Sequence, residues 1–522
     1  MLNIPALEQQ VTELMVQYKI PGLSLAVVHE SQVVYASGFG VTSVEEHGIT
    51  VTPRTLFRIG STTKPLTGTA IMRLVESGRL DLDTPVGRYM PELKFSRPGA
   101  EQEITLRMLL THTSGLDCQN NPYGSRDPEA GERFLLDLLP RVPFAAEPGT
   151  LKIYSNPGFA LAACIAARVY GKPVAAMVRE LVFAPLSMER STFDPLDALT
   201  YPFALSHNLR PDGTLEVARP VVESTGMHGA GFAMSTVLDM AKFAIMQMDG
   251  AGPLQEMHRM QAPHYTVDGA GYGIAFTVSA YKGLKRVGQG GGIHSYHCSF
   301  DMLPEARTAV IIMASRPAPP GVHLKLINDC FDQVLDLPAE LPAAPEPVDI
   351  APGPAFAGLY LSRLSGLLTV SVTAEGLTLE MMGRSTPLKA YSPTIYFGPR
   401  PDGQGIRSVG FIQAEPGQPC RYVMVDGSSA VRFDPDPGFV PDKDLLERYA
   451  GTYLAPPHGR EDVRLWVGDD GRLWGSFAWY PGQAFPCTPL NSDTHFASGG
   501  GSFVMNEGAL EINGWKLPKA GT

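Results

Sequence analysis

A short apolar run that ends in a glycine and leads into a helical pattern places a serine at a strand-to-helix junction. The run covers residues 55–59, Gly60 follows it, and apolar residues then recur at helical spacing as far as Gly78, a typical helix C-cap. Ser61 therefore lies at a helix start, where backbone N–H groups have no partner within the helix. Lys64 stands three residues later on the same helix face, so its amine can reach the serine hydroxyl.

Ser61 and Lys64 are a candidate nucleophile and base. A serine hydroxyl attacks a carbonyl only when a neighbouring base accepts its proton, and a lysine can act as that base only if burial lowers its pKa. The pattern alone is weak, since Ser279 and Lys282 have the same spacing with no apolar helix behind them. A capped and solvated helix start is the alternative interpretation of Ser61.

Charge and cysteine content narrow the function classes. The 522 residues carry a net charge of -11 and contain no run of Lys or Arg, which argues against nucleic-acid binding and against an anionic membrane surface. The six cysteines are dispersed without a Cys-x-x-Cys pair, so we expect neither a disulfide framework nor a zinc site, and no cofactor. The first forty residues predict a helix followed by two strands. Residues 1–20 show an amphipathic helical pattern and no signal-peptide or membrane-span pattern, so we expect a cytoplasmic protein. Residues 22–40 are predicted to form a β-hairpin.

Tyr154 and Asn156 form a second candidate group. They lie in a loop braced by glycine and proline, just before another helical pattern, where side chains project from a held backbone. The tyrosine can carry a proton and the asparagine can bind an amide, although a simple contact within the loop is the alternative. His112, near the end of an apolar helical pattern at residues 104–115, also invites a catalytic interpretation, but a histidine there more often binds local carbonyls.

A glycine cluster after an apolar strand pattern at residues 274–278 is the third candidate group. It begins at Gln289, and Gly290 and Gly291 would let a ligand approach the strand backbone closely. A glycine-rich phosphate loop is the competing interpretation, but its Gly-Lys-Ser/Thr ending is absent and no helix pattern begins there. We therefore expect a strand whose backbone a ligand can approach.

In this order, Ser61-x-x-Lys64, Tyr154-x-Asn156 and Gln289-Gly290-Gly291 resemble the three motifs of the serine β-lactamase and penicillin-binding-protein superfamily. The resemblance is strongest to its class C, esterase and D-aminopeptidase branch. It covers about residues 1–335 and implies an α+β catalytic domain, an antiparallel sheet flanked by helices with a helical subdomain.

The resemblance also implies a mechanism. Ser61 would attack a carbonyl to give an acyl-enzyme that water then releases, while Lys64 and Tyr154 share the moving proton. The residues do not decide which of the two is the general base. Asn156 would orient the substrate amide, and the oxyanion would lie between the N–H of Ser61 and an N–H of the 290–292 strand.

The third motif departs from the family pattern, which usually has Lys-Thr-Gly or His-x-Gly. Gln289 cannot carry a positive charge, so it cannot hold a substrate carboxylate or stabilise Tyr154 as an anion. Roles of the strand backbone at Gly290 and Gly291 are unaffected. We therefore expect substrates without a free carboxylate beside the scissile bond.

The chain beyond residue 335 changes in composition and then repeats itself. Residues 336–352 are a Pro/Ala-rich linker, and similar strand patterns at residues 353–438 and 439–522 predict two small antiparallel β-barrels that resemble lipocalins. An aromatic loop at residues 477–485 is expected either to pack its aromatic side chains on its own barrel or, as the resemblance to D-aminopeptidases implies, to border the active site. One catalytic domain followed by two such barrels is the layout of bacterial D-aminopeptidases.

Three functions follow from these features. The first is a D-stereospecific aminopeptidase or amidase acting on short peptides or amides. A carboxylesterase with the same nucleophile is one alternative, and a noncatalytic binder of peptidoglycan-like peptides is the other. The expected partner is a small peptide, amide or ester substrate, without nucleic acid or membrane, and the oligomeric state stays open, a homodimer included.

Overall fold

The computed structural model describes most of the chain. It covers residues 2–520 except 46, 117–126, 128–129, 211, 220, 222, 251, 263–264, 268, 320, 339–343, 363–365, 374–375, 382–383, 401–405, 413–417, 435, 437, 455–462, 478–483, 492–494, 499–500, 507 and 513–514.

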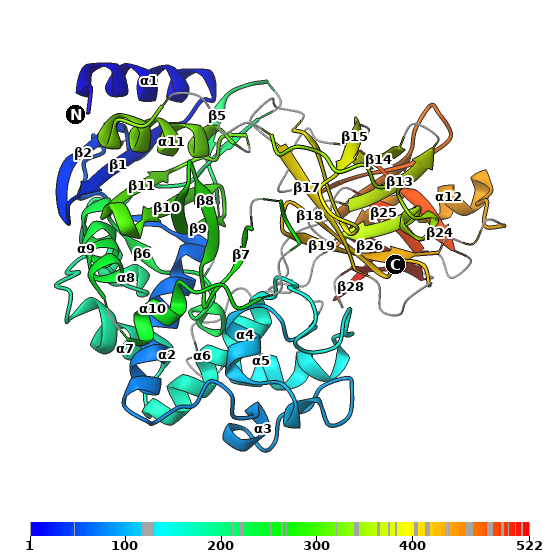
Figure 1. Cartoon of the computed structure of the whole chain (residues 1–522), viewed down its shortest axis with the longest axis horizontal. Helices are drawn as coiled ribbons and strands as arrows, with labels where there is room; N and C mark the ends of the chain where they lie inside the picture. The colour runs from blue at the N-terminus through cyan, green and yellow to red at the C-terminus, as the bar shows by residue number, and fades with distance from the viewer. Residues whose placement is uncertain are drawn as a thin grey trace.

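An antiparallel sheet forms the centre of the N-terminal part (Figure 1). In the described residues it has seven strands in the order β2-β1-β11-β10-β9-β8-β7. Their bounds are β1 Gly22–His29, β2 Gln32–Gly40, β7 Gly271–Tyr272, β8 Thr277–Tyr281, β9 Leu284–Ile293, β10 Tyr296–Leu303 and β11 Thr308–Ala314. The predicted hairpin is β1 and β2, and β1 pairs with β11 from the far end of this part of the chain.

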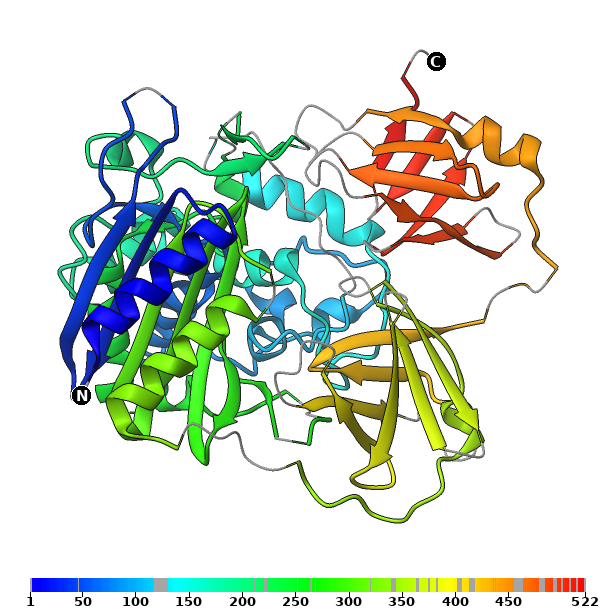
Figure 2. The same ribbon diagram turned by 90° about the horizontal axis from the view of Figure 1, so that it is seen from above.

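Helices cover both faces of the sheet. Figure 2 shows two of them lying across one face, α1 (Ile4–Gln17) and α11 (Val322–Leu335). Strand β1 explains this layering, because Leu23 and Val27 pack in the core beneath these helices, whereas Ala26 and Val28 pack in the larger core on the opposite face. Both faces of the strand are thus buried, as its almost continuous apolar sequence indicates.

The larger core is built mainly by helices between β2 and β7. They are α2 (Thr63–Glu76), α3 (Val86–Tyr89), α4 (Leu106–Leu110), α5 (Ala130–Leu138), α6 (Asn156–Tyr170), α7 (Val174–Val178), a π-helix (Arg179–Phe183), α8 (Pro195–Ala198), α9 (Val237–Asp249) and α10 (Pro253–Met257). The helix expected over residues 104–115 is shorter than its pattern suggests, since α4 ends at Leu110. His112 has φ +59°, a left-handed conformation that a helix cannot contain.

The described helices are too short or too polar to span a membrane on their own. No single helix is long and apolar enough to cross a bilayer, and only α6 taken together with the helical segment Val174–Phe183, at 77° to it, meets the length and composition criteria.

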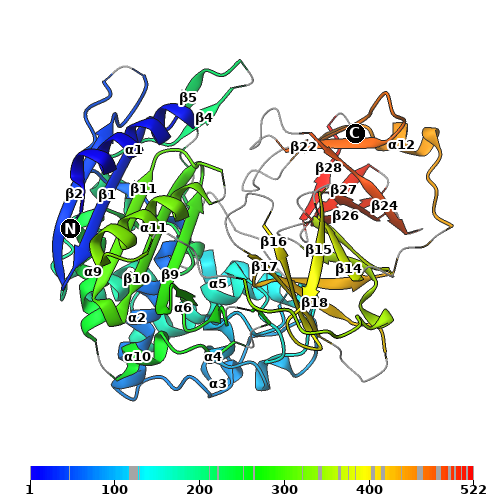
Figure 3. The ribbon, with the colours of Figure 1, turned by 45° about the horizontal axis from the view of Figure 1, so that its top comes forward.

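The first C-terminal module is a closed eight-stranded antiparallel barrel (Figure 3). Its strands are β12 (Gly358–Ser362), β13 (Gly366–Thr373), β14 (Gly376–Met381), β15 (Arg384–Ala390), β16 (Ile395–Pro399), β17 (Ile406–Ile412), β18 (Tyr422–Val425) and β19 (Ser428–Phe433). Alternating residues such as Val423 and Val425 fill its interior. A closed barrel in this region is therefore confirmed, and the likeness to lipocalins stays a prediction.

The second module contains helix α12 (Lys443–Tyr449) and two antiparallel sheets in its described residues. One sheet has strands β20 (Gly451–Tyr453), β21 (Val463–Val467), β22 (Leu473–Phe477) and β23 (Phe485–Pro486). The other has β24 (Thr488–Asn491), β25 (His495–Ser498), β26 (Gly501–Asn506), β27 (Ala509–Ile512) and β28 (Trp515–Pro518). A second closed barrel stays a prediction, and most of the aromatic loop at 477–485 lies outside the described residues.

Candidate active site

Ser61 lies in a tight turn that packs directly on strand β9. The turn is a short 3-10 helix, Gly60–Thr62, which continues into α2. Gly60 has φ +52°, and a Cβ atom there would come within 2.7 Å of the backbone nitrogen of Gly292. A Cβ atom on Gly291 would come within 1.9 Å of the carbonyl oxygen of Ile59. The glycines of the first and third motifs thus let two backbones touch beside Ser61.

Strand β9 offers an open edge at the same place. Strand β8 pairs with β9 only as far as the pair of Thr277 with Gly288. Residues 289–293 therefore have no neighbouring strand on that side in the described sheet, while β10 pairs with them on the other. The hydroxyl of Thr62 donates a hydrogen bond to the carbonyl of Gln289 over 3.1 Å, which fixes the Ser61 turn against this edge.

Lys64 is fully buried and surrounded by three oxygen atoms. Its Nζ lies 3.0 Å from Oγ of Ser61, 2.7 Å from Oδ1 of Asn156 and 2.8 Å from the carbonyl oxygen of Ala230. The amide and backbone oxygens only accept hydrogen bonds, whereas the Ser61 hydroxyl can also donate one. A neutral amine can thus donate to Asn156 and Ala230 and still direct its lone pair at the Ser61 proton.

The electrostatics of Lys64 favour that neutral form. Burial holds its pKa well below the usual value of a lysine. Among the described residues no carboxylate forms a salt bridge with it, so nothing there offsets the loss of water around an ammonium. Lys64 consequently meets the requirement that a lysine acting as a base has a lowered pKa.

Tyr154 is a protonated phenol beside the same hydroxyl. It forms a side-chain hydrogen bond with Ser61, and Lys64 Nζ lies 4.8 Å from the centre of its ring. Burial raises the pKa of Tyr154 and outweighs the lowering effect of the hydrogen bond with Ser61. The phenol therefore keeps its proton at neutral pH and can pass it on or receive another.

The segment that carries Tyr154 is extended and alternates in burial. Leu151, Ile153 and Ser155 are buried, while the residues between them are partly exposed. Ser155 ends the segment because its Oγ accepts a hydrogen bond from the N–H of Gly158 over 3.1 Å and caps α6. Side chains two residues apart thus share one side of the segment, as in a strand.

His112 packs on Tyr154 and does not take part in the Ser61 contacts that the structure records. The two ring centres are 4.2 Å apart, and Nδ1 of His112 accepts a hydrogen bond from the N–H of Ser155 over 3.2 Å. The expected partner was a local carbonyl, and the structure corrects this to a backbone N–H. Burial, together with the nearby charge of Lys152, holds the pKa of His112 well below its usual value, so the ring is neutral.

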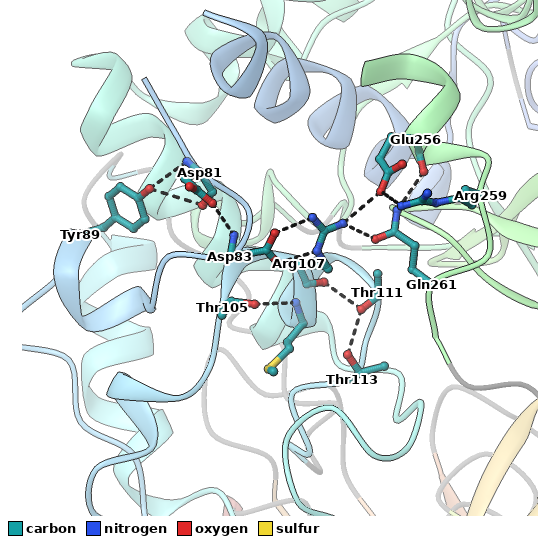
Figure 4. A network of polar contacts seen from close by, with 11 residues as sticks. Asp81, Asp83, Tyr89, Thr105, Arg107, Thr111, Thr113, Glu256, Arg259 and Gln261 are labelled. Atoms are coloured by element: carbon teal, nitrogen blue, oxygen red, sulfur yellow. Dashed lines mark hydrogen bonds and ion pairs between the residues drawn. The ribbon is translucent and has the colours of Figure 1, made fainter. Parts of the chain in front are cut away.

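An arginine network fixes the helix that leads to His112 (Figure 4). Arg107 in α4 binds both carboxylate oxygens of Asp83, at 2.6 and 2.7 Å, and donates to Oε1 of Gln261 over 2.6 Å. Just beyond the helix, the hydroxyls of Thr111 and Thr113 are 2.9 Å apart. These contacts join three separate chain segments and hold the turn in which His112 adopts its positive φ.

Gln289 is buried and bound within the protein. Its Oε1 accepts a hydrogen bond from the hydroxyl of Tyr272 over 2.9 Å, and its Nε2 donates to the carbonyl of Gly290 over 2.8 Å. The side chain therefore supplies no charge to the site, as the sequence predicts. It anchors Tyr272, whose ring centre lies 5.0 Å from that of His112.

The loop that supplies the Ala230 carbonyl rests on a buried ion pair. Arg58 donates to Oε2 of Glu223 over 3.1 Å, and Oε1 of Glu223 lies 3.0 Å from Nε2 of His228. Sequence reasoning did not identify Ala230 because a carbonyl has no residue signature. It also did not identify Lys152 or Tyr272, although the period of two from Lys152 to Tyr154 was available as a signal.

The structure thus brings Ser61, Lys64, Tyr154 and Asn156 into one contact group, with Gln289, Gly290 and Gly291 on the adjoining strand edge. Their chemical roles stay predictions. Among the described side chains, no group of three or more His, Cys, Asp or Glu is arranged to hold a metal ion.

Comparison with known proteins points in the same direction. The family model described as Beta-lactamase matches residues 7–328. The chain is 26% identical over 379 residues to penicillin-binding protein 4 of Amycolatopsis lactamdurans, covering 68% of this chain and 96% of that protein. It is 26% identical over 319 residues to the unguisins hydrolase ungD' of Aspergillus campestris, covering 57% of this chain and 59% of that one.

A solved structure shares the fold over most of the chain. The octameric penicillin-binding protein homologue from Pyrococcus abyssi has a TM-score of 0.58 at 24% identity, and the match covers 83% of this chain and all of that one.

Proposed function

The chain belongs to the beta-lactamase family of serine hydrolases, and we propose that it is a D-stereospecific aminopeptidase or amidase that cleaves short peptides or amides. As a hydrolase of this fold it acts on small-molecule substrates. The observation that carries the proposal is the environment of Lys64, a buried amine in contact with Ser61 and without a carboxylate partner in the described residues. A protein that only binds peptides has no need for a lysine held in this state.

In the proposed mechanism Lys64 accepts the proton of Ser61 as Oγ attacks the substrate carbonyl. The negative charge on the carbonyl oxygen is stabilised by the N–H of Ser61 and an N–H of the open β9 edge. The proton then passes, by way of the Tyr154 hydroxyl, to the leaving nitrogen as the C–N bond breaks. A water molecule attacks the resulting ester with the same groups, and the acid is released while Ser61 regains its proton.

Two measurements test the proposal. A fluorophosphonate probe should label the purified protein at Ser61, and a panel of D- and L-aminoacyl nitroanilides, nitrophenyl esters and a chromogenic cephalosporin should show cleavage of the D-aminoacyl amides above the others. Cleavage of esters alone would favour the carboxylesterase. Binding of peptidoglycan-like peptides without labelling or cleavage would identify a noncatalytic binder.

The first barrel packs against the chain segment that carries Tyr154. On β18, Tyr422 and Met424 point away from the barrel interior and are buried against Leu151 and Ile153 of the Tyr154 segment. The buried half of that segment thus packs on the barrel, which leaves the other half directed at Ser61 and Lys64. We infer that the barrel positions Tyr154 and Asn156.

Replacing Met424 with aspartate should lower kcat by about 10- to 100-fold, because a carboxylate at this buried contact loosens the support of Tyr154 and small misplacements of reacting groups are costly. Steady-state kinetics and circular dichroism of the full chain would measure the effect. The matched control is Val440→Asp, since Val440 is 83% exposed. A folded Met424→Asp chain with wild-type kcat would show that the barrel does not position the site.

A further inference from the structure

Lys152 shares the substrate-facing side of the Tyr154 segment. In the alternation from Leu151 to Asn156, the partly exposed positions are Lys152, Tyr154 and Asn156. The second and third of these contact Ser61 or Lys64. Lys152 thus lies on the same side of the backbone as the two motif residues, two positions before Tyr154.

The Lys152 ammonium lies against a carbonyl oxygen and an aromatic ring. Nζ donates to the carbonyl oxygen of Gly427, in the β18–β19 turn of the barrel, over 3.1 Å. It also lies 5.1 Å from the centre of the Tyr272 ring. No salt bridge to Lys152 is found in the part of the chain that the structure describes. By contrast, Lys282, whose side chain is 5% exposed, lies 2.7 Å from a carboxylate oxygen of Asp332.

The carbonyl and the ring make up for only part of the hydration that the Lys152 ammonium loses on burial. Burial lowers the pKa of Lys152 to about 8. A carbonyl dipole and an aromatic face each stabilise a cation modestly, and an ammonium has three donors, so an incoming anion can still bind. Removing an ammonium from water without an anion is otherwise costly.

The position of Lys152 relates it to the third motif. The Lys152 ammonium lies over the ring of Tyr272. The Tyr272 hydroxyl donates a hydrogen bond to Gln289, the residue that stands where the family usually has a cation. We propose that Lys152, with Tyr272, forms a subsite that binds a carboxylate of the substrate and so supplies from the second motif the cation that Gln289 cannot. The proposal rests on the proposed hydrolase function and names a group that its substrate carries.

This subsite revises the expectation drawn from Gln289 alone. A peptide with a free C-terminal carboxylate is accepted if that carboxylate reaches Lys152 and not Gln289. The occupant is a carboxylate because a single ammonium, already bound to one carbonyl, matches one singly charged group. The barrel takes part through the Gly427 carbonyl, which holds the ammonium over the Tyr272 ring.

The test compares two substrates that differ only in charge, a D-aminoacyl-D-alanine dipeptide and its C-terminal carboxamide. The ratio of kcat/KM for the carboxylate to that for the carboxamide should fall at least about 10-fold in Lys152→Met, mainly through KM for the carboxylate. Lys152→Arg should keep most of the wild-type ratio, because it keeps the positive charge. Lys389→Met is the matched control, since Lys389 is exposed on the barrel strand β15 and should leave the ratio unchanged.

A binding measurement separates this proposal from the proposed function. Calorimetric titration of Ser61→Ala chains with N-acetyl-D-alanine and with its carboxamide needs no turnover. The carboxylate should bind at least about 10-fold tighter than the carboxamide when Lys152 is present, and the difference should disappear with Lys152→Met. Equal changes for both ligands, in kinetics or in binding, would overturn the carboxylate subsite even if the protein is a hydrolase.

Discussion

Replacing Ser61 with alanine should reduce turnover of every substrate of this protein by at least about 1000-fold. We expect the acyl-enzyme to form on Ser61, because the Lys64 amine at 3.0 Å and the open β9 edge are both arranged around Oγ of Ser61. Steady-state kinetics would measure the loss. Intact-mass measurement after treatment with a fluorophosphonate should show the added mass on the wild-type chain and none on Ser61→Ala.

The chain provides its own control for the Ser-x-x-Lys spacing. Ser279 and Lys282 repeat it, but Ser279 lies on strand β8 and Lys282 is paired with Asp332. Ser279→Ala should therefore keep wild-type rates and full labelling. Substantial turnover by Ser61→Ala, or loss of labelling in Ser279→Ala, would contradict the assignment of Ser61 as nucleophile.

The sequence predicts those parts of the site whose geometry is set by residues close together in the chain. Ser61 and Lys64 are joined by helical spacing, and the glycines of the third motif mark a close backbone approach, so both could be found from residue types alone. Asn156 required a resemblance, because its contact with Lys64 joins residues 92 positions apart. A local pattern carries no information on which distant segments meet.

The features that the sequence did not predict depend on tertiary contacts. The pattern over residues 104–115 is apolar enough for a longer helix, but His112 leaves it to bind the N–H of Ser155, and the Arg107 contacts hold that turn. Lys152 looks like an ordinary loop lysine until the barrel turn and Tyr272 enclose it. The environment of each was decided by another part of the chain.

The two C-terminal modules also show that sequence patterns do not specify contacts between distant segments. Their similar strand patterns predict two related units, and each pattern opens on an aromatic-Ala-Gly sequence, at residues 356–358 and 449–451. The described residues form a closed barrel in the first and two antiparallel sheets in the second. Barrel closure requires pairing of the first and last strands, here β12 with β19, and strand patterns do not specify that contact.

Replacing Lys64 should lower kcat nearly as far as replacing Ser61 does. Comparing a methionine with an arginine at this position tests whether Lys64 acts as a base. Lys64→Met keeps the length of the side chain but removes the amine, and we expect a fall in kcat of at least about 100-fold with the fold retained. Lys64→Arg should fall as far, because a guanidinium does not lose its proton and cannot act as a base. Kinetics and thermal unfolding of both variants would measure the effect.

The pH dependence of the wild-type chain follows from the same group. Burial holds the pKa of Lys64 well below its usual value, so the neutral amine persists below the ordinary titration range of lysine and is lost as pH falls through that lowered pKa. The kcat should accordingly be sustained below the ordinary titration range of lysine and fall on the acid side as Lys64 takes up a proton. If Lys64→Arg instead retained wild-type kcat, the contribution of Lys64 would be its positive charge, and the role of general base would have to pass to another group.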